Sequence, residues 1–195
     1  MKQNHLIIGV LSGLLLCWLP GCSIIHDNER SRYADATMDF SSIATVAVLP
    51  FANLASEEQG AGRVRDTFTG ALLATEAFYV LPHGETARIL SRAGIRDATA
   101  PASEDVEKLG GANGIDAIIT AVLREYGAVR SGNTGANVIS ISMQMIETQT
   151  GKVVWSASTT KGGISVWDRL FGGGGEPMNG VTEAAVYDLI DQLFQ

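Results

Sequence analysis

The chain has 195 residues, of which 46% are hydrophobic and 18% charged, and this balance fits one globular domain with an ordinary core. Its formal net charge of −7 argues against nucleic-acid binding, because proteins that bind nucleic acid present a basic surface. The sequence shows no second domain and no internal repeat of the kind that builds a solenoid.

The first 21 residues have the organisation of a secretory signal peptide. Lys2 precedes an uncharged apolar block at residues 6–20, which is shorter than the roughly 20 apolar residues of a membrane-spanning helix. The stretch Leu19-Pro20-Gly21-Cys22 resembles the bacterial lipobox. The resemblance implies cleavage between Gly21 and Cys22 and a covalent lipid on the Cys22 thiol, with no other cofactor.

Acyl chains on Cys22 would hold the protein stably on a membrane. Ser23, which follows, resembles the signal for sorting to the outer membrane, so we expect a domain that faces the periplasm. The alternative is a free or disulfide-bonded Cys22. Cys17 leaves with the signal peptide, so the mature chain would have one cysteine and no internal disulfide.

Residues 22–42 are polar and mixed in charge, and they are expected to be a tether between the lipid and the domain. Tyr33, Met38 and Phe40 are large apolar side chains within this segment, so part of it could pack on the domain. The domain itself is expected at residues 43–195.

Hydrophobic spacing predicts the elements of this domain. Residues 43–51 are a continuous apolar run, typical of a strand buried on both faces. The further expected elements are helices at 63–75, 83–93, 103–109 and 181–194, and strands at 77–81, 115–123, 137–148 and 152–160. The last two strands form an antiparallel hairpin, and residues 129–135 form a turn before it. The sequence therefore predicts a single α/β domain, a mixed sheet with helices packed on it.

Residue patterns that carry enzyme chemistry are missing from the sequence, which has no G-x-S-x-G elbow, no H-E-x-x-H helix and no P-loop. His83 is expected at the exposed start of a helix rather than as a general base. The segment Gly60–Gly62 has only the first half of a dinucleotide-binding fingerprint and is expected to be a loop. We therefore expect no catalytic residue, no metal site, no small-molecule substrate and no enzyme activity.

Two features suggest contacts with other molecules. Trp167, Leu170 and Phe171 stand beside four consecutive glycines and could touch a membrane or a partner, or fold back onto the sheet. The Ser/Thr/Gln face of the two late strands is either a docking face or a solvated sheet face.

Three motifs occur in the order found in the CsgG-type family of periplasmic and outer-membrane lipoproteins. Residues 43–53 resemble its "AVLPF–N" first strand, residues 114–119 its "GAD-A-I-I" strand, and residues 147–155 its "D-x-x-TG-x-V-x-W" hairpin. Glu147 departs from the family, which often has Asp there. LpoB activators of penicillin-binding proteins are relatives, and the N-terminal domain of TolB is similar in fold. The resemblance implies a CsgG-like periplasmic α/β domain.

CsgG itself has two long insertions that become membrane hairpins of an oligomeric pore. The corresponding segments here, 125–137 and 162–179, cannot supply two strands of roughly 9–11 residues each with apolar alternation. We therefore expect a non-enzymatic accessory or assembly factor of envelope biogenesis or secretion, which binds a protein partner or itself. The alternatives are a subunit of a CsgG-like secretion channel and an LpoB-like activator of a peptidoglycan synthase.

Overall fold

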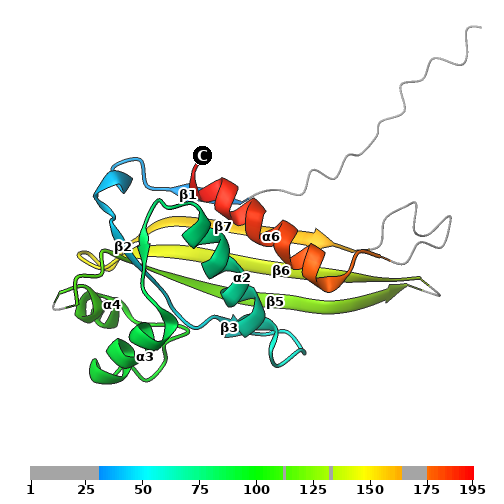
Figure 1. Ribbon diagram of the computed structural model, residues 1–195, viewed down its shortest axis with the longest axis horizontal. Helices are drawn as coiled ribbons and strands as arrows, with labels where there is room; N and C mark the ends of the chain where they lie inside the picture. Colours follow the sequence, from blue (N-terminus) through cyan, green and yellow to red (C-terminus); the bar gives the residue numbers. More distant parts are fainter. Residues whose placement is uncertain (1–30, 112, 132–133, 164–174) are drawn as a thin grey trace, which may run out of the picture.

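A seven-stranded mixed sheet organises the computed structural model, which describes residues 31–111, 113–131, 134–163 and 175–195 (Figure 1). The strand order is β1-β7-β6-β5-β2-β4, with β3 beside β5. The strands are β1 (Arg32–Ala34), β2 (Thr45–Val48), β3 (Ala52–Asn53), β4 (Tyr79–Val80), β5 (Ala117–Ser131), β6 (Thr134–Glu147) and β7 (Val153–Gly162). The helices are the 3-10 turn η1 (Phe40–Ser42), α2 (Gly60–Ala74), α3 (His83–Arg92), α4 (Ser103–Gly110) and α6 (Met178–Leu193).

The sheet mixes both kinds of pairing, as the sequence predicted. Strand β2 runs parallel to β4 and β5, whereas β5, β6 and β7 form an antiparallel meander and β1 joins the outer side of β7 antiparallel. The expected late hairpin is therefore confirmed as β6–β7. The expected α/β class is also confirmed.

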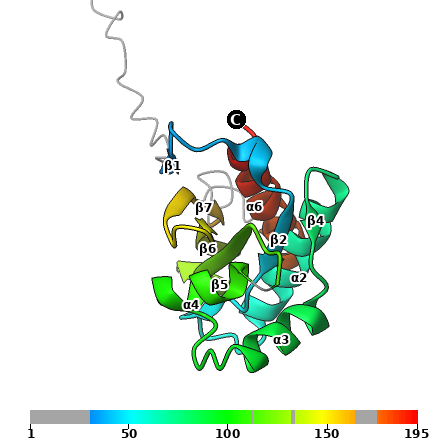
Figure 2. The same ribbon diagram turned by 90° about the vertical axis from the view of Figure 1, so that its left-hand side faces the viewer.

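Helices cover the sheet on both sides, α2 and α6 on one face and α3 and α4 on the other (Figure 2). The position of β2 between two layers of helices explains why its sequence is continuously apolar. Val46 and Val48 enter the core under α2 and α6, while Ala47 and Leu49 enter the smaller core under α3 and α4. All four side chains are fully buried, as a strand between two helical layers requires.

The strand β5 is longer than the sequence predicted. It was expected to end at residue 123 and to be followed by a turn at 129–135, but it runs to Ser131 and pairs with β6 up to Ser131 and Thr134. A bulge between Leu123 and Glu125 shifts the pairing register. A bulge breaks the two-residue alternation, and the second half of the strand is therefore hidden in the sequence pattern.

The domain begins before residue 43, where its start was expected. Strand β1 and η1 fall within the segment expected to be a tether. The Asp35 amide donates to the Val154 carbonyl at 2.8 Å, and Met38 and Phe40 pack against the main core. The chain therefore belongs to the fold from Arg32 onward. Residues 1–30 lie outside the described residues.

Candidate functional site

The residues that the sequence singled out for lipidation and membrane contact lie outside the described residues. These are Gly21 and Cys22 at the lipobox, and Trp167, Leu170 and Phe171 in the late glycine-rich segment. Cleavage, acylation and the contact role of the late segment therefore stay predictions. Within the described residues, the candidate site is the Ser/Thr/Gln face of the sheet.

One face of the meander is polar because alternate residues point to opposite sides of a strand. Ile139, Ile141, Met143 and Met145 of β6 are completely buried under the helices, and the residues between them point the other way. Cross-strand pairing places these outward-pointing residues of β6 beside their partners on β5 and β7, in two rows across the sheet. We call this surface the polar sheet face, and its residues are Tyr33, Thr120, Val122, Ser142, Gln144, Ser156 and Ser158.

Helices α3 and α4 cover only one end of this side of the sheet, at the left in Figure 1. The long strands continue beyond them, and no other described helix packs on the polar sheet face. Gln144 is exposed, and Tyr33 at the edge keeps 50% of its surface exposed. The predicted polar alternation is therefore confirmed, and the structure leaves this face open.

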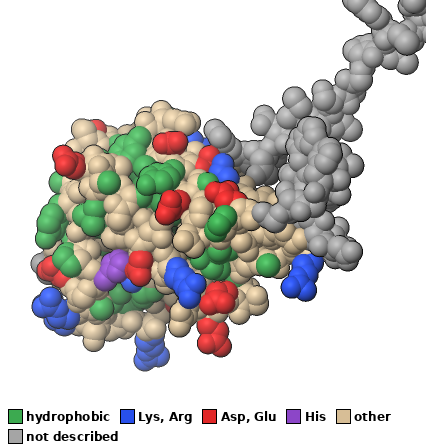
Figure 3. Space-filling view, turned by 45° about the vertical axis from the view of Figure 1, so that its right-hand side comes forward, with side chains coloured by type: hydrophobic (Ala, Val, Ile, Leu, Met, Phe, Trp, Pro, Cys, Tyr) green, Lys and Arg blue, Asp and Glu red, His purple; other side chains and the backbone are tan. Residues whose placement is uncertain are grey.

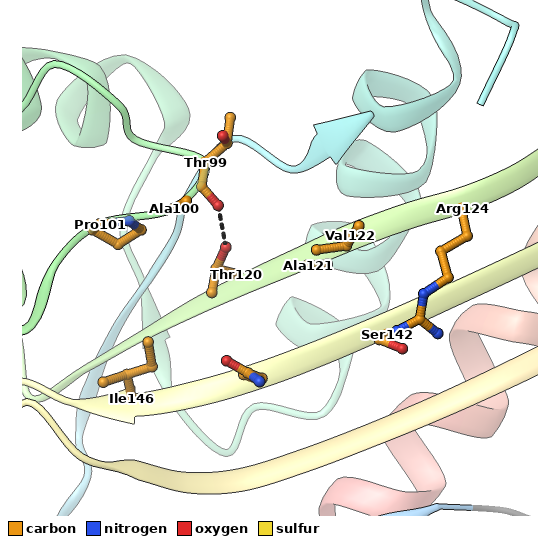
Figure 4. A pocket seen from close by; sticks show the side chains of 10 residues that line it. Thr99, Ala100, Pro101, Thr120, Ala121, Val122, Arg124, Ser142 and Ile146 are labelled. Carbon is orange, nitrogen blue, oxygen red and sulfur yellow. Dashed lines mark hydrogen bonds between the residues drawn. The ribbon is translucent and has the colours of Figure 1, made fainter. Parts of the chain in front are cut away.

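A loop before α4 turns part of the polar sheet face into a groove (Figure 4). The Asp97 carboxylate accepts hydrogen bonds from the Thr99 amide at 2.9 Å and from its hydroxyl at 2.7 Å. These bonds lower the pKa of Asp97 below its ordinary value, the hydroxyl bond contributing most. The Thr120 hydroxyl in turn donates to the Thr99 carbonyl at 3.2 Å, which fastens the loop to β5.

The groove has a volume of about 350 Å³. The loop residues Thr99, Ala100 and Pro101 form one wall, and β5 and β6 form the floor. Arg124, at the bulge of β5, is the one charged residue that lines it, and Figure 4 shows its side chain reaching across toward Ser142 on β6. The remaining floor residues are Thr120, Ala121, Val122, Ser142, Gln144 and Ile146.

A second polar cluster joins α2 to α3. His83 Nε2 lies 3.1 Å from the Thr69 hydroxyl, and His83 Nδ1 lies 3.5 Å from a carboxylate oxygen of Asp66. Burial lowers the pKa of His83, the positive charge of Arg65 lowers it further, and Asp66 opposes both. The Thr69 hydroxyl donates to the Arg65 carbonyl at 2.8 Å and is buried. The arrangement therefore ties the two helices together and does not present a nucleophile to solvent.

Residues Gly60, Ala61 and Gly62 were expected in a loop, but they form the first turn of α2. A β-carbon on Gly60 would lie 3.1 Å from side-chain atoms of Leu123 and Tyr126. The absence of a side chain therefore lets the helix start pack closely on β5.

Residues of the three sequence motifs hold the fold together. A carboxylate oxygen of Asp116 accepts the amides of Ala44 and Thr45 at 3.0 and 2.8 Å, joining the starts of β5 and β2. The Asn53 side-chain amide donates to two carbonyls of the loop before α2. Trp155 is fully buried. The motifs thus identify structural positions rather than a binding site.

The part of the chain that the structure describes shows neither a metal-binding cluster nor a membrane-spanning helix. No cluster of three or more His, Cys, Asp and Glu side chains there is arranged to hold a metal ion. Across the same residues, no helix combines the length and the apolar character needed to span a membrane. On the face shown in Figure 3, acidic and basic side chains are interspersed and do not form a patch of one sign.

Comparison with solved structures supports the fold. Lipoprotein GNA1162 from Neisseria meningitidis is 21% identical, with 77% of this chain and 98% of that chain covered and a TM-score of 0.56. The PelC dodecamer from Paraburkholderia phytofirmans is 14% identical over 84% and 95% of the two chains, also with a TM-score of 0.56. The C-terminal domain of LpoB from Salmonella enterica is 16% identical over 65% of this chain and 86% of that chain, with a TM-score of 0.49.

Comparison at the level of sequence families identifies the chain. No curated protein matches it. The family described as "Putative lipoprotein GNA1162-like" matches residues 33–192, which is most of the chain. This is not the CsgG-type family whose motifs the sequence resembles, so CsgG-type membership stays a prediction. The chain belongs to the GNA1162-like lipoprotein family.

Proposed function

We propose that this protein is a non-enzymatic lipoprotein, anchored in the outer membrane by an acylated Cys22, that binds a protein partner in the periplasm. Membership of a lipoprotein family and the lipobox at residues 19–22 support the anchor. The partner-binding role is supported by one structural observation above all, the polar sheet face, which the described helices leave open beyond the end covered by α3 and α4.

The polar sheet face suits docking because it combines hydrogen-bonding groups with an aromatic edge. Its hydroxyl and amide groups can give orientation, and interfaces generally surround a few buried anchors with such a polar rim. Tyr33 is half exposed at the edge of the face and is the kind of side chain that anchors an interface. The role would be that of an accessory or assembly factor in envelope biogenesis or secretion.

Self-association is the second candidate. The PelC structure is a dodecamer of a chain with this fold, which supports testing for a ring. The subunit of a CsgG-like secretion channel is one version of this candidate. An LpoB-like activator of a peptidoglycan synthase would instead bind its partner as a monomer, and that version rests on the sequence motifs.

Site-specific photo-cross-linking in cells tests the docking role. A photoreactive phenylalanine derivative replaces Tyr33 on the polar sheet face or, as a matched control, Tyr187, which is 59% exposed on α6 across the sheet. We expect a cross-link to another protein from position 33 and none from position 187. Cross-links from position 187 alone, or from neither position, would contradict the proposal.

The mass of the detergent-extracted full-length protein separates the two candidates. Size exclusion with light scattering should give a monomer or dimer for an accessory factor. A closed ring of many subunits would favour self-association, and cross-links from position 33 would then join copies of the same chain.

A further inference from the structure

We propose that the groove on the polar sheet face binds the free carboxyl end of an extended peptide, with Arg124 as the group that receives the carboxylate. The inference rests on the proposed docking function and deepens it, because it names the part of a partner that the face receives.

The first support is the unused hydrogen-bonding capacity of the groove. Among the described residues, no hydrogen bond or ion pair involves the side chain of Arg124, Ser142 or Gln144. Arg124 alone carries five N–H donors in a planar fork that fits a carboxylate with two parallel bonds. The three side chains come from adjacent strands and line one groove.

The second support is the charge of the groove. Arg124 is its one charged residue, and no acidic side chain lines it. Glu125, the next residue in the chain, is exposed and lies outside the lining. One guanidinium among neutral groups matches a ligand with a single negative charge better than a phosphate, which carries more charge and attracts several cations.

The third support is the apolar part of the lining. Ala100 and Pro101 on the wall, with Val122 and Ile146 on the floor, can receive a small aliphatic side chain next to the carboxylate. The volume of about 350 Å³ is at the small end of ligand pockets. A ligand that matches this groove therefore has a carboxylate, amide groups and a small aliphatic side chain. The last residues of a peptide carry all three.

The occupant is assigned to another protein rather than to a second copy of this chain. Phe194, directly after α6, stacks on Phe78 with ring centres 5.9 Å apart. The segment that follows α6 is therefore packed against its own domain and is not an extended strand that a second copy could receive.

The test uses the tripeptide acetyl-Ala-Ala-Val as the probe, with a free carboxylate or with a carboxyl-terminal amide. Amide signals of the full-length protein in detergent are followed by NMR during each titration. We expect saturable shifts in residues 99, 100, 120–124 and 142–144 with the free carboxylate. Amidation should weaken binding about tenfold or more, because a hydrogen bond to a charged group is lost.

Variants of Arg124 identify the receiving group. Arg124→Gln should weaken binding of the free carboxylate about tenfold and leave binding of the amide unchanged. Arg124→Lys should recover part of the loss, since it keeps the charge without the planar fork. Arg130→Gln is the matched control, because Arg130 lies on the same strand outside the groove and should leave binding unchanged.

Three outcomes would overturn the inference: no saturable shift, equal binding of the acid and the amide, or equal Arg124-dependent binding of inorganic phosphate, which would show an unselective anion site. Self-association through the groove would appear as a concentration-dependent mass that Arg124→Gln abolishes, and this too would overturn it. Each of these outcomes leaves the cross-link from position 33 as an independent test of the docking function.

Discussion

The indole Nε1 of Trp155 donates a hydrogen bond to the backbone carbonyl of Gln192, 3.1 Å away, and thereby joins β7 to the last turn of α6. The Nε of Arg32 donates to the same carbonyl at 2.8 Å. Carbonyls in the last turn of a helix have no partner within the helix. Side chains from two segments far apart in the sequence thus donate to the same carbonyl at the end of α6.

Replacing Trp155 should destabilise the domain strongly. Trp155→Ala is expected to lower the free energy of unfolding by about 3–5 kcal/mol, because it leaves a large cavity in the core. Trp155→Phe keeps most of the packing and loses the bond to Gln192, for a loss of about 1–2 kcal/mol. Urea denaturation followed by circular dichroism measures both. Val129→Ala, at an exposed position of the β5–β6 hairpin, is the control and should change little.

Gly110 at the end of α4 should not tolerate a side chain. A β-carbon there would lie 2.5 Å from the Thr148 hydroxyl, which is buried and donates to the carbonyls of Ile115 and Asp116. Gly110→Ala should therefore cost about 1–3 kcal/mol of unfolding free energy. Gly111→Ala is the matched control, since nothing lies within 4 Å of its β-carbon position. Equal stability of the two variants in urea denaturation would contradict this packing.

Asp116 should stabilise the fold by closing the starts of two strands. Asp116→Ala removes the acceptor for the amides of Ala44 and Thr45, and we expect a loss of about 1–3 kcal/mol in thermal or urea unfolding. Asp116→Asn retains an acceptor oxygen and should lose less. Asp191→Ala, an exposed acid on α6, serves as the control for removing a charge.

His83 should make stability depend on pH. Its pKa in the folded protein lies below its ordinary value of 6.5, so the unfolded chain binds a proton more readily. The contribution of neutral His83 is present above pH 6.5 and is lost as the pH falls through the lowered pKa. Between pH 7 and pH 5, we expect the free energy of unfolding of His83→Gln to decline less steeply than that of the parent protein. Superimposable curves would show that His83 titrates normally.

Cys22→Ala tests the anchor. Loss of the thiol should prevent acylation and cleavage, so a larger precursor should accumulate in cells and the processed, detergent-extracted form should disappear. The readouts are the mass of the protein and metabolic labelling with a fatty acid. Unchanged processing would contradict the lipobox interpretation.

Much of the fold could be predicted because its signals are local. The apolar run of β2 and the alternation of β6 lie within single elements, and the pattern alone identified which side chains are buried. In α2 the buried side chains of Val64, Phe68 and Leu72 recur every four residues, which is likewise a local pattern. Each of these patterns lies within a single element and shows which of its side chains face the core.

Elements that depend on distant partners could not be predicted in the same way. Strand β1 has three residues, and its place in the sheet comes from pairing with residues 155–157 and from the bond between Arg32 and Gln192. The second half of β5 is a strand because β6 pairs with it past the bulge. A short or irregular pattern carries too little information by itself to specify such pairings.

The sequence by itself determined the α/β class, the buried faces, the polar alternation and the prediction of a lipid anchor, because each is written in neighbouring residues. Only the tertiary structure decided that the polar face stays open and that it is hollowed. The bond from Thr120 to Thr99 spans 21 positions, and the fold brings that loop beside Arg124, which no local pattern connects with it. A groove is formed by segments that meet only when the chain has folded.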